Sequence, residues 1–432
     1  MNKKYRVDKI NSYNGWDPLK QVILGNIYKP EFFEDLPDPR TRDLMQQLLY
    51  ETHEDLDNIQ KTMEDLGVDV VRTPSNATQI SGIENLVDFG GQVPEHGTVM
   101  EWWELEKESG RKINGIPKPC LAPRDMFITM GDKLLYTSGY IGAPTDIKHV
   151  LPLSVALISP DVMDMRLAKP NDGTNMQEWF STRGPFKLSD EYMKEYGFDL
   201  EWNDLSNPKP PGISRNYSRN HKYWQYLKST HAFWAPTVTR CGDRLIVDNK
   251  DVKNLSNVME EMYPQFKTPN VAIGGHNDGS FNLPKPGLAI CAPWVEPERF
   301  KDTLPGWDIL RIQDPTTMQS DWGPWEHQKH LAQGRYWTPD MADNPEFANY
   351  VDNWLSEWVG VAEETLFEVN MLSVNESTIL SLNYQKEVHN KLLKHGIEPV
   401  YCRFRHRNFW DSGLHCLTVD TVREGGMQNY FE

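Results

Sequence analysis

The 432-residue sequence is poor in cysteine, and the few that it has are widely spaced. Its five cysteines, an odd number that includes no CxxC pair, are Cys120, Cys241, Cys291, Cys402 and Cys416. A zinc knuckle, a thioredoxin-type site and a disulfide scaffold all need closer or paired cysteines. We therefore expect reduced thiols and a cytoplasmic location.

Long apolar runs are also missing. No stretch approaches the roughly 18 apolar residues that a membrane-spanning helix requires. The charged residues at 1–6 are not followed by the apolar segment of a secretory signal. The sequence therefore predicts neither a membrane span nor a leader peptide, and we expect no membrane partner.

Positive charge is in short supply. Lys and Arg total 45 against 62 Asp and Glu, which gives a formal net charge of −17. Nucleic acids and anionic membranes are bound by clustered basic side chains, so we expect no nucleic-acid partner. The acidic excess is compatible with a cationic substrate, although solubility alone explains it equally well.

Motifs for metals and nucleotides are lacking as well. The sequence contains no HExxH and no GxxxxGK[ST] motif. His327 and His330 lie three residues apart, but no acidic residue follows at ligand spacing. Gly274-Gly275 could approach a phosphate, yet Asp278 close by would repel it. We therefore expect neither a metal nor an organic cofactor.

What the sequence does contain is a recurring pattern of short β-rich runs around polar turns. Such pairs of runs predict β-hairpins. They lie at Met126–Tyr136, Val238–Val247, Phe281–Cys291 and Val369–Leu382, with further strands at Gln21–Leu24 and near Val400–Phe404, the last one leading to Cys416.

Helical patterns alternate with these hairpins. The predicted helices are Asp38–Leu66, Val252–Tyr263, Pro345–Val361 and Tyr384–His395. A unit of hairpin plus helix cannot bury its apolar face alone, so several units must stack or close into a ring. Two long segments, at about 152–229 and 307–344, interrupt the pattern. We interpret them as lids, binding loops or interfaces, or as surface decoration.

Candidate functional residues lie at the ends of the predicted strands. Pro123-Arg124-Asp125 precedes the first hairpin, a glycine-rich run at 274–279 containing His276 and Asp278 precedes the third, and Gly413-Leu414-His415-Cys416 begins the last strand pair. A histidine beside an acid is a possible general acid or base, and a cysteine near it a possible nucleophile. Taken singly, each residue fits a structural role as well.

Together these segments resemble the glycine amidinotransferase family. The resemblance covers residue 14 to the C-terminus and depends on four blocks in the same order, namely Asn14–Gly25, Pro123–Asp125, His276–Asn282 and Phe404–Thr418. It implies an α/β fold, the pentein α/β propeller, with about five ββαβ units around a pseudo-fivefold axis. It also implies a single domain over residues 1–432, with the two long segments as insertions.

The resemblance further implies roles for four residues. Cys416 would be the nucleophile, His276 the general acid/base, and Asp125 with Asp278 the carboxylates that hold a guanidinium group. The expected reaction moves the amidino group of arginine, or a similar guanidine, through a covalent cysteine intermediate to a small amine. The expected partners are a guanidine donor and an amine acceptor, and a homodimer is left open.

The sequence departs from the family in its second hairpin. The run His231–Gly242 has no carboxylate where the family places an acid beside the histidine. Val295 stands where the family has an arginine, with Arg299 following closely, and Glu363-Glu364 and Glu368 align with a serine-bearing stretch. We therefore expect an acceptor other than glycine. A guanidino-group hydrolase of the same superfamily and a non-catalytic pentein binding protein remain alternatives.

Overall fold

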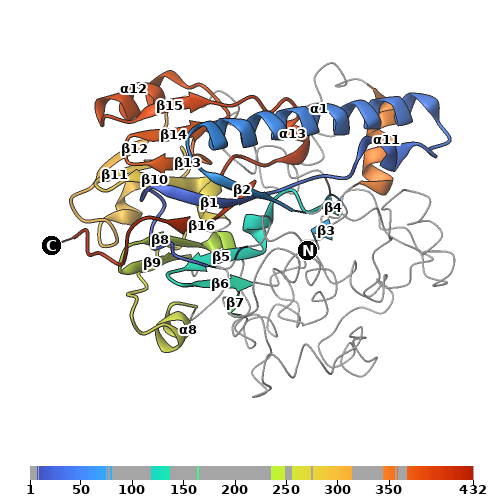
Figure 1. Ribbon diagram of the computed structural model, residues 1–432. Coiled ribbons are helices and arrows are strands. Elements are labelled where there is room, and N and C mark those ends of the chain that lie inside the picture. Colours follow the sequence, from blue (N-terminus) through green and yellow to red (C-terminus); the bar gives the residue numbers. More distant parts are fainter. Residues whose placement is uncertain are drawn as a thin grey trace, which may run out of the picture.

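The structure is a computed structural model with mixed α and β elements (Figure 1). It describes residues 7, 9–73, 75, 78–79, 118–136, 163–164, 235–248, 255–273, 276–313, 344–355, 358 and 367–431. The α-helices are α1 (Pro39–Asp65), α8 (Leu255–Met262), α9 (Asn277–Ser280), α11 (Pro345–Trp354), α12 (Lys386–Lys394) and α13 (Arg407–Trp410). Four 3₁₀ helices are η2 (Pro30–Phe33), η3 (Pro123–Asp125), η7 (Ala235–Thr237) and η8 (Pro297–Phe300).

The strands form small sheets of two or three members. They are β1 (Leu19–Leu24), β2 (Asp69–Arg72), β3 (Thr78–Gln79), β4 (Lys118–Pro119), β5 (Phe127–Met130), β6 (Lys133–Tyr136), β7 (Met163–Asp164), β8 (Val238–Cys241), β9 (Arg244–Val247), β10 (Phe281–Lys285), β11 (Leu288–Cys291), β12 (Asp308–Arg311), β13 (Leu372–Asn375), β14 (Thr378–Ser381), β15 (Glu398–Tyr401) and β16 (Thr418–Arg423).

One unit recurs among these sheets. An antiparallel hairpin is followed by a strand that pairs in parallel with the second strand of the hairpin. In β13-β14-β15, Leu380 faces Leu372 in the antiparallel pair and Val400 in the parallel one, and α12 connects β14 to β15. The sheets β10-β11-β12 and β5-β6-β7 repeat this pattern. The predicted hairpins are therefore confirmed.

Two further units complete the pattern. The β8-β9 hairpin has α8 after it and then parallel bridges from Arg244 to Lys267 and from Val247 to Asn270. In the other unit, β16 pairs antiparallel with β1, and β1 pairs in parallel with β2 across α1. Within the described ranges the unit therefore occurs five times. The strand that follows Cys416 pairs with the first strand of the chain rather than with the strand near residues 400–404, because the two ends of the chain share one sheet.

The predicted helices are present with shifted ends. α1 matches its predicted range, and its Asp38 N-cap accepts a hydrogen bond from the Thr41 amide at 3.0 Å. Helix α11 ends at Trp354 instead of Val361, with Leu355 as its C-cap. The segment 307–344 is not wholly a loop, since β12 lies in it and pairs with β11, while 314–343 fall outside the described residues. So does most of 152–229, of which only 163–164 are described, within β7.

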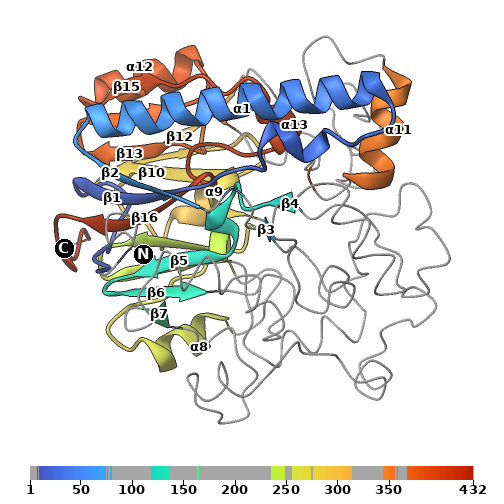
Figure 2. The same cartoon turned by 45° about the vertical axis from the view of Figure 1, so that its right-hand side comes forward.

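Helix α1 lies across the outside of the molecule and supports the chain that leads to Cys416 (Figures 1 and 2). Its buried face, which includes Leu48, Leu56 and Ile59, belongs to the largest apolar cluster. From its other turns, Asp55 accepts the Arg405 backbone amide at 2.6 Å, and Thr52 accepts the Trp410 indole N–H at 3.0 Å. These contacts fix α13 relative to the sheets.

A buried ionic cluster lies where three of the units meet. The carboxylate of Asp420, on β16, binds Arg124 at 2.6 Å, Arg240 at 2.7 Å and Arg423 at 2.6 Å. Ser12 donates a further hydrogen bond to it at 3.1 Å. Because three guanidinium groups surround one carboxylate, the pKa of Asp420 lies well below its usual value despite the burial of this side chain.

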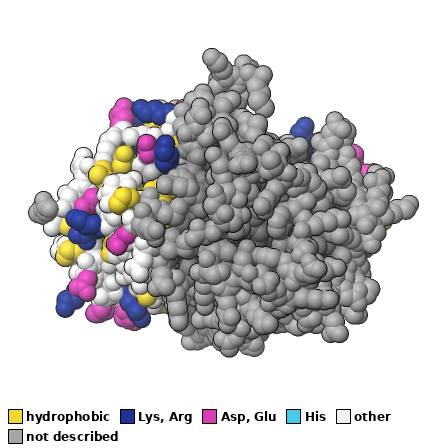
Figure 3. Space-filling model, turned by 90° about the horizontal axis from the view of Figure 1, so that it is seen from below, with side chains coloured by type: hydrophobic (Ala, Val, Ile, Leu, Met, Phe, Trp, Pro, Cys, Tyr) yellow, Lys and Arg dark blue, Asp and Glu magenta, His cyan; other side chains and the backbone are white. Residues whose placement is uncertain are grey.

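The described surface has no comparable concentration of charge in the view of Figure 3, where basic, acidic and apolar side chains are interspersed. Exposed ion pairs such as Lys61–Asp65 and Lys20–Glu424 contribute little, because water screens them. The buried cluster is therefore the electrostatic feature that matters for the fold.

Replacing Asp420 by Asn is expected to lower the free energy of unfolding by about 3–5 kcal/mol, because it leaves three buried guanidinium groups without a carboxylate. Asp308→Asn is the matched control. Asp308 also binds two basic side chains, Lys391 and His395, but its side chain is 44% exposed, so the loss should stay below about 1 kcal/mol. Urea unfolding measures both values.

The stability that Asp420 contributes depends on pH in a direction that its lowered pKa fixes. A carboxyl group whose folded pKa is depressed stabilises the protein above its unfolded pKa of about 4 and loses that contribution as the pH falls through the lower folded value. The difference between wild type and Asp420→Asn should therefore be constant at neutral pH and shrink below about pH 4. Equal losses in the two variants would contradict this account of the cluster.

Candidate active site

Cys416 lies in a single helical turn between α13 and β16. The amide of Leu417 donates to the carbonyl of Gly413 at 3.0 Å and closes this turn. The side chain is buried, and Cys416 is only 4% exposed. The first residue of β16, Thr418, accepts the Arg124 Nε–H at its carbonyl at 3.0 Å, which ties the turn to the Asp420 cluster.

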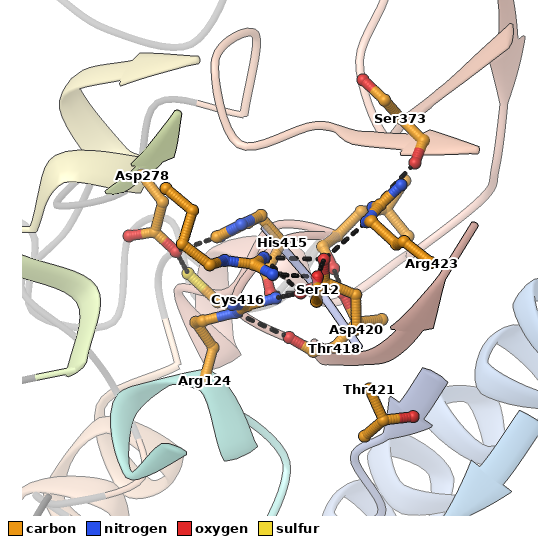
Figure 4. Close-up of polar contacts among 12 residues, drawn as sticks. Ser12, Arg124, Asp278, Ser373, His415, Cys416, Thr418, Asp420, Thr421 and Arg423 are labelled. Atoms are coloured by element: carbon orange, nitrogen blue, oxygen red, sulfur yellow. Dashed lines mark hydrogen bonds and ion pairs between the residues drawn. The ribbon is translucent and has the colours of Figure 1, made fainter. Parts of the chain in front are cut away.

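Asp278 faces this thiol from α9, as Figure 4 shows. Its Oδ2 lies 3.5 Å from Cys416 Sγ and accepts a hydrogen bond from His415 Nδ1 at 2.7 Å. Its Oδ1 is buried and has no hydrogen-bond partner in the described structure. One oxygen of the carboxylate is thus held by His415, whereas the other has no donor among the described residues.

Asn370 contacts the turn that carries Cys416. Its Nδ2 donates to Cys416 Sγ at 2.9 Å and to the carbonyl of Asp278 at 3.0 Å. Its Oδ1 accepts the amide N–H of His415 at 2.9 Å and that of Cys416 at 3.0 Å. The backbone donors beside the sulfur are therefore occupied by an amide oxygen.

The charges around the thiol oppose its ionisation. Burial raises the pKa of Cys416 well above its usual value, and the negative charges of Asp278 and Asp125 raise it further. The hydrogen bond from Asn370 acts in the other direction. With no ligand bound, the sulfur is therefore held as a thiol at neutral pH.

Asp278, in contrast, is held ionised. Burial favours its neutral form, but the hydrogen bond from His415 and the positive charges of the histidines and Arg124 outweigh this and lower its pKa. Burial and repulsion by Arg124 lower the pKa of His415, so its imidazole is neutral at pH about 7. Because an ionised carboxylate only accepts hydrogen bonds, His415 carries its proton on Nδ1, and Nε2 is left as an acceptor.

The four residues singled out from the sequence come together here, although they are far apart in the chain. Cys416 and Asp278 are adjacent. Asp125, the last residue of η3, is half-buried and near enough to raise the pKa of the thiol. His276, the half-buried N-cap of α9, is near enough to lower the pKa of Asp278. Their proximity does not by itself assign their roles.

The structure bears on two positions at which the sequence departs from the family. Arg299 is exposed on η8, and Val295 is buried in an apolar cluster, so the described structure places neither against the thiol. On the second hairpin, residues 235–240 carry no carboxylate, and the Thr237 carbonyl instead accepts Asn277 Nδ2 at 3.0 Å. Residues 231–234, the other part of that comparison, lie outside the described residues.

Sequence reasoning missed Asn370 and the contact of His415 with Asp278. For His415, the signal was its position directly before Cys416. For Asn370, the sequence offered no signal, because it lies at the start of a hairpin in which polar and apolar residues alternate.

Both non-glycine residues with positive φ in the described structure, Ala272 and Asp411, lie on the segments that lead to His276 and Cys416. Strained backbone of this kind is typical of functional sites.

The described residues include neither a metal-binding cluster nor a membrane-spanning helix. No group of three or more His, Cys, Asp and Glu side chains is arranged to bind a metal ion in the part of the chain that the structure describes. No helix there has the length and apolar content to cross a membrane.

Comparison with known proteins supports the resemblance seen in the sequence. A segment of 170 residues, 38% of this chain and 30% of the relative, is 27% identical to the mitochondrial glycine amidinotransferase of Xenopus laevis. Over 97% of this chain and 84% of the relative, identity to the enzyme of that name from Xenopus tropicalis is 20%. The alignment thus spans less than a third of the first relative. No family model matches the chain.

Solved structures agree with these relatives. SxtG, an amidinotransferase of the saxitoxin biosynthetic pathway from Microseira wollei, superposes with a TM-score of 0.54 at 16% identity, over 98% of this chain and 99% of its own. Inosamine-phosphate amidinotransferase StrB1 from Streptomyces griseus gives 0.54 at 17% identity over the same shares. The resemblance to amidinotransferases is therefore confirmed, and the two structures show a fold that this chain shares.

Asp278→Asn is expected to lower the pKa of Cys416, because it removes the larger of the two negative charges that oppose ionisation of the thiol. Alkylation of Cys416 by iodoacetamide should then be about tenfold faster at neutral pH for each unit by which the pKa falls. Rates measured across pH, with the modified cysteine located by peptide mass spectrometry, test this. Asp308→Asn is the control. A profile for Asp278→Asn that is unchanged, or shifted to higher pH, would contradict the electrostatic account.

Proposed function

We propose that this protein is an amidinotransferase that moves the amidino group of arginine, or of a similar guanidine, to a small amine through a covalent intermediate on Cys416. The observation that carries the proposal is the position of Asp278. Its ionised carboxylate lies beside the Cys416 thiol and has a buried oxygen with no hydrogen-bond partner in the described structure. A guanidinium group supplies paired N–H donors and a positive charge to such an acceptor.

The surroundings of the sulfur favour a cationic reacting group over a carbonyl. Acyl transfer needs N–H donors where an oxyanion develops, and in many enzymes the backbone of the nucleophile provides one. Here the N–H groups of His415 and Cys416 both donate to Asn370 Oδ1. Two carboxylates therefore lie near the reacting sulfur, and the backbone N–H groups beside it are not free for an oxyanion, which suits a centre that stays positively charged throughout the reaction.

Substrate binding and activation of the thiol are linked in this proposal. Burial is the main cause of the raised pKa of Cys416, and the charges of Asp278 and Asp125 add to it. A guanidinium bound by these two carboxylates compensates their charges, which lowers the pKa of the thiol and favours transfer of its proton when the substrate is in place. The carboxylates also align the plane of the guanidinium with the sulfur, which is the positioning part of catalysis.

The chemical steps then follow. The thiol of Cys416 passes its proton to His276, and the resulting thiolate attacks the guanidinium carbon. The departing nitrogen takes this proton from His276, its C–N bond breaks, and ornithine leaves if arginine is the donor. The amidino group remains on sulfur as a cation. An amine then gives up a proton to His276, its nitrogen attacks the same carbon, and the C–S bond breaks. The sulfur takes the proton back from His276, which restores the thiol.

The fold suits this arrangement. We propose that the five described units form a pentein propeller around a pseudo-fivefold axis, with the site at its centre and residues 1–432 as one domain. The Asp420 cluster, which joins arginines from three units next to the nucleophile turn, supports this view. The acceptor is left open. SxtG and StrB1 are both named amidinotransferases without glycine in their names, so this fold is compatible with other acceptors.

Incubation with arginine labelled with ¹³C at the guanidino carbon, and a panel of small amines, tests the proposal. We expect ornithine to be released only when a suitable amine is present, and the label to appear on that amine in mass spectra. Cys416→Ser should reduce turnover by about 10³-fold or more, because the hydroxyl is a far weaker nucleophile in this environment.

The other outcomes of this assay distinguish the alternative functions. Labelled citrulline or urea formed equally well without amine would replace the transferase with a hydrolase. The absence of turnover with every guanidine, while the protein still binds arginine, would support a binding protein. Cys402→Ser, at a buried thiol beneath α1, is the control and should leave turnover unchanged.

A further inference from the structure

Asn370 differs from the other polar residues near the site because all of its hydrogen-bonding capacity is used on the nucleophile turn and on Asp278. Two donors and two acceptor positions are available on a side-chain amide. The donors go to Cys416 Sγ and the Asp278 carbonyl, and Oδ1 accepts from the amides of His415 and Cys416. The side chain is buried, with Asn370 0% exposed.

We propose that Asn370 is the positioning residue of the nucleophile. Its amide aims Cys416 Sγ at the guanidinium carbon, stabilises the thiolate through the N–H···S hydrogen bond, and keeps Asp278 at a fixed separation from the sulfur. The assignment rests on the proposed role of Cys416 as nucleophile, and it identifies a residue that acts through the reacting sulfur rather than on the substrate.

Gly413 supports this assignment independently. A Cβ at this position would overlap the Cβ, Cγ and Oδ1 atoms of Asn370. The φ angle of Gly413 is not positive, so backbone conformation does not require glycine here. The requirement is for space, and the space is filled by the amide of Asn370.

The hydrogen bond to sulfur is the one contact of Asn370 that a purely structural role would not need. The two bonds to backbone amides and the bond to the Asp278 carbonyl already join the three segments. Asn370 and the backbone of Gly413 both form hydrogen bonds that favour the thiolate, whereas Asp278 opposes it by charge, and Asn370 is the side chain among these two donors. Loss of this donor should therefore be visible in the chemistry of the sulfur.

Asn370→Asp and Asn370→Ala test the proposal. The aspartate keeps the shape but loses both donors, and the alanine removes the amide without adding charge. Both should shift the pH profile of Cys416 alkylation upward, so that the rate at neutral pH falls about tenfold or more. In the transfer assay we expect kcat to fall about 10²-fold while KM for the guanidine changes far less, because Asp125 and Asp278 remain.

Asn282→Ala is the matched control. Asn282 Nδ2 donates to the carbonyl of Met371 at 2.9 Å, so this variant loosens the same segment without touching the sulfur. Its alkylation profile and kcat should match those of the wild type. Gly413→Ala, which displaces the amide and also disturbs the backbone hydrogen bond of Gly413 to the sulfur, should shift the profile upward as well.

The outcomes separate this proposal from the proposed function. An alkylation profile in Asn370→Ala equal to that of the wild type, or one that Asn282→Ala shifts equally, would overturn the positioning role even if amidino transfer is observed. A shifted profile with no transfer by the wild-type protein would retain the positioning role and reject the transferase. Thermal unfolding of each variant identifies those that fold, and Asn370→Ala decides if the aspartate variant does not.

Discussion

The binding of three arginines to Asp420 is the interaction on which the site depends. The carboxylate is buried, and its partners come from η3, β8 and β16, so one residue holds together units that are far apart in the sequence. Arg124 also binds the carbonyl of Thr418 just after the turn that carries Cys416. The pKa of Asp278 is lowered, against the effect of burial, chiefly by the hydrogen bond from His415, and the charge of Arg124 makes a smaller contribution. The cluster therefore helps to fix the position of the Cys416 turn, and one of its arginines also acts on the charge of the site.

The second constraint is the placement of a carboxylate next to a thiol. With no ligand bound, burial and the carboxylate charge together keep Cys416 as a neutral thiol. In the proposed function, a guanidinium cation compensates the carboxylate charge and favours the thiolate. The feature that keeps the sulfur protonated at rest is, in that proposal, also the one that selects the charge of the substrate.

Much of the fold could be predicted from the sequence, and the reasons are local. The turns at Gly131, Gly242 and Gly287 have positive φ angles between alternating apolar runs, which is a signal that a single sequence contains. The cap of α1 at Asp38 is equally local. The pairing of β16 with β1 could not be predicted in this way, since it joins the two ends of the chain. β12 was missed because its four residues lie at the start of a segment in which tryptophan, proline and glycine recur.

The residues of the site likewise fall into those that the sequence marks and those that it does not. His276, Asp278 and Cys416 have neighbours in the sequence that mark them, whereas Asn370 becomes notable only when its four hydrogen bonds are seen. Asp125 was marked by its place before the first predicted hairpin, and its role was implied by the resemblance alone. A single sequence therefore pointed to the charged and thiol-bearing residues, and it could not point to Asn370, the neutral residue that contacts them.

The most direct test of the account is the mass of the protein quenched in acid during reaction with arginine. The account predicts that the wild-type chain gains the mass of one amidino group, that peptide mapping places it on Cys416, and that adding a competent amine removes it. A wild-type protein that converts arginine without ever carrying this group, or that carries it on a different residue, would contradict the account.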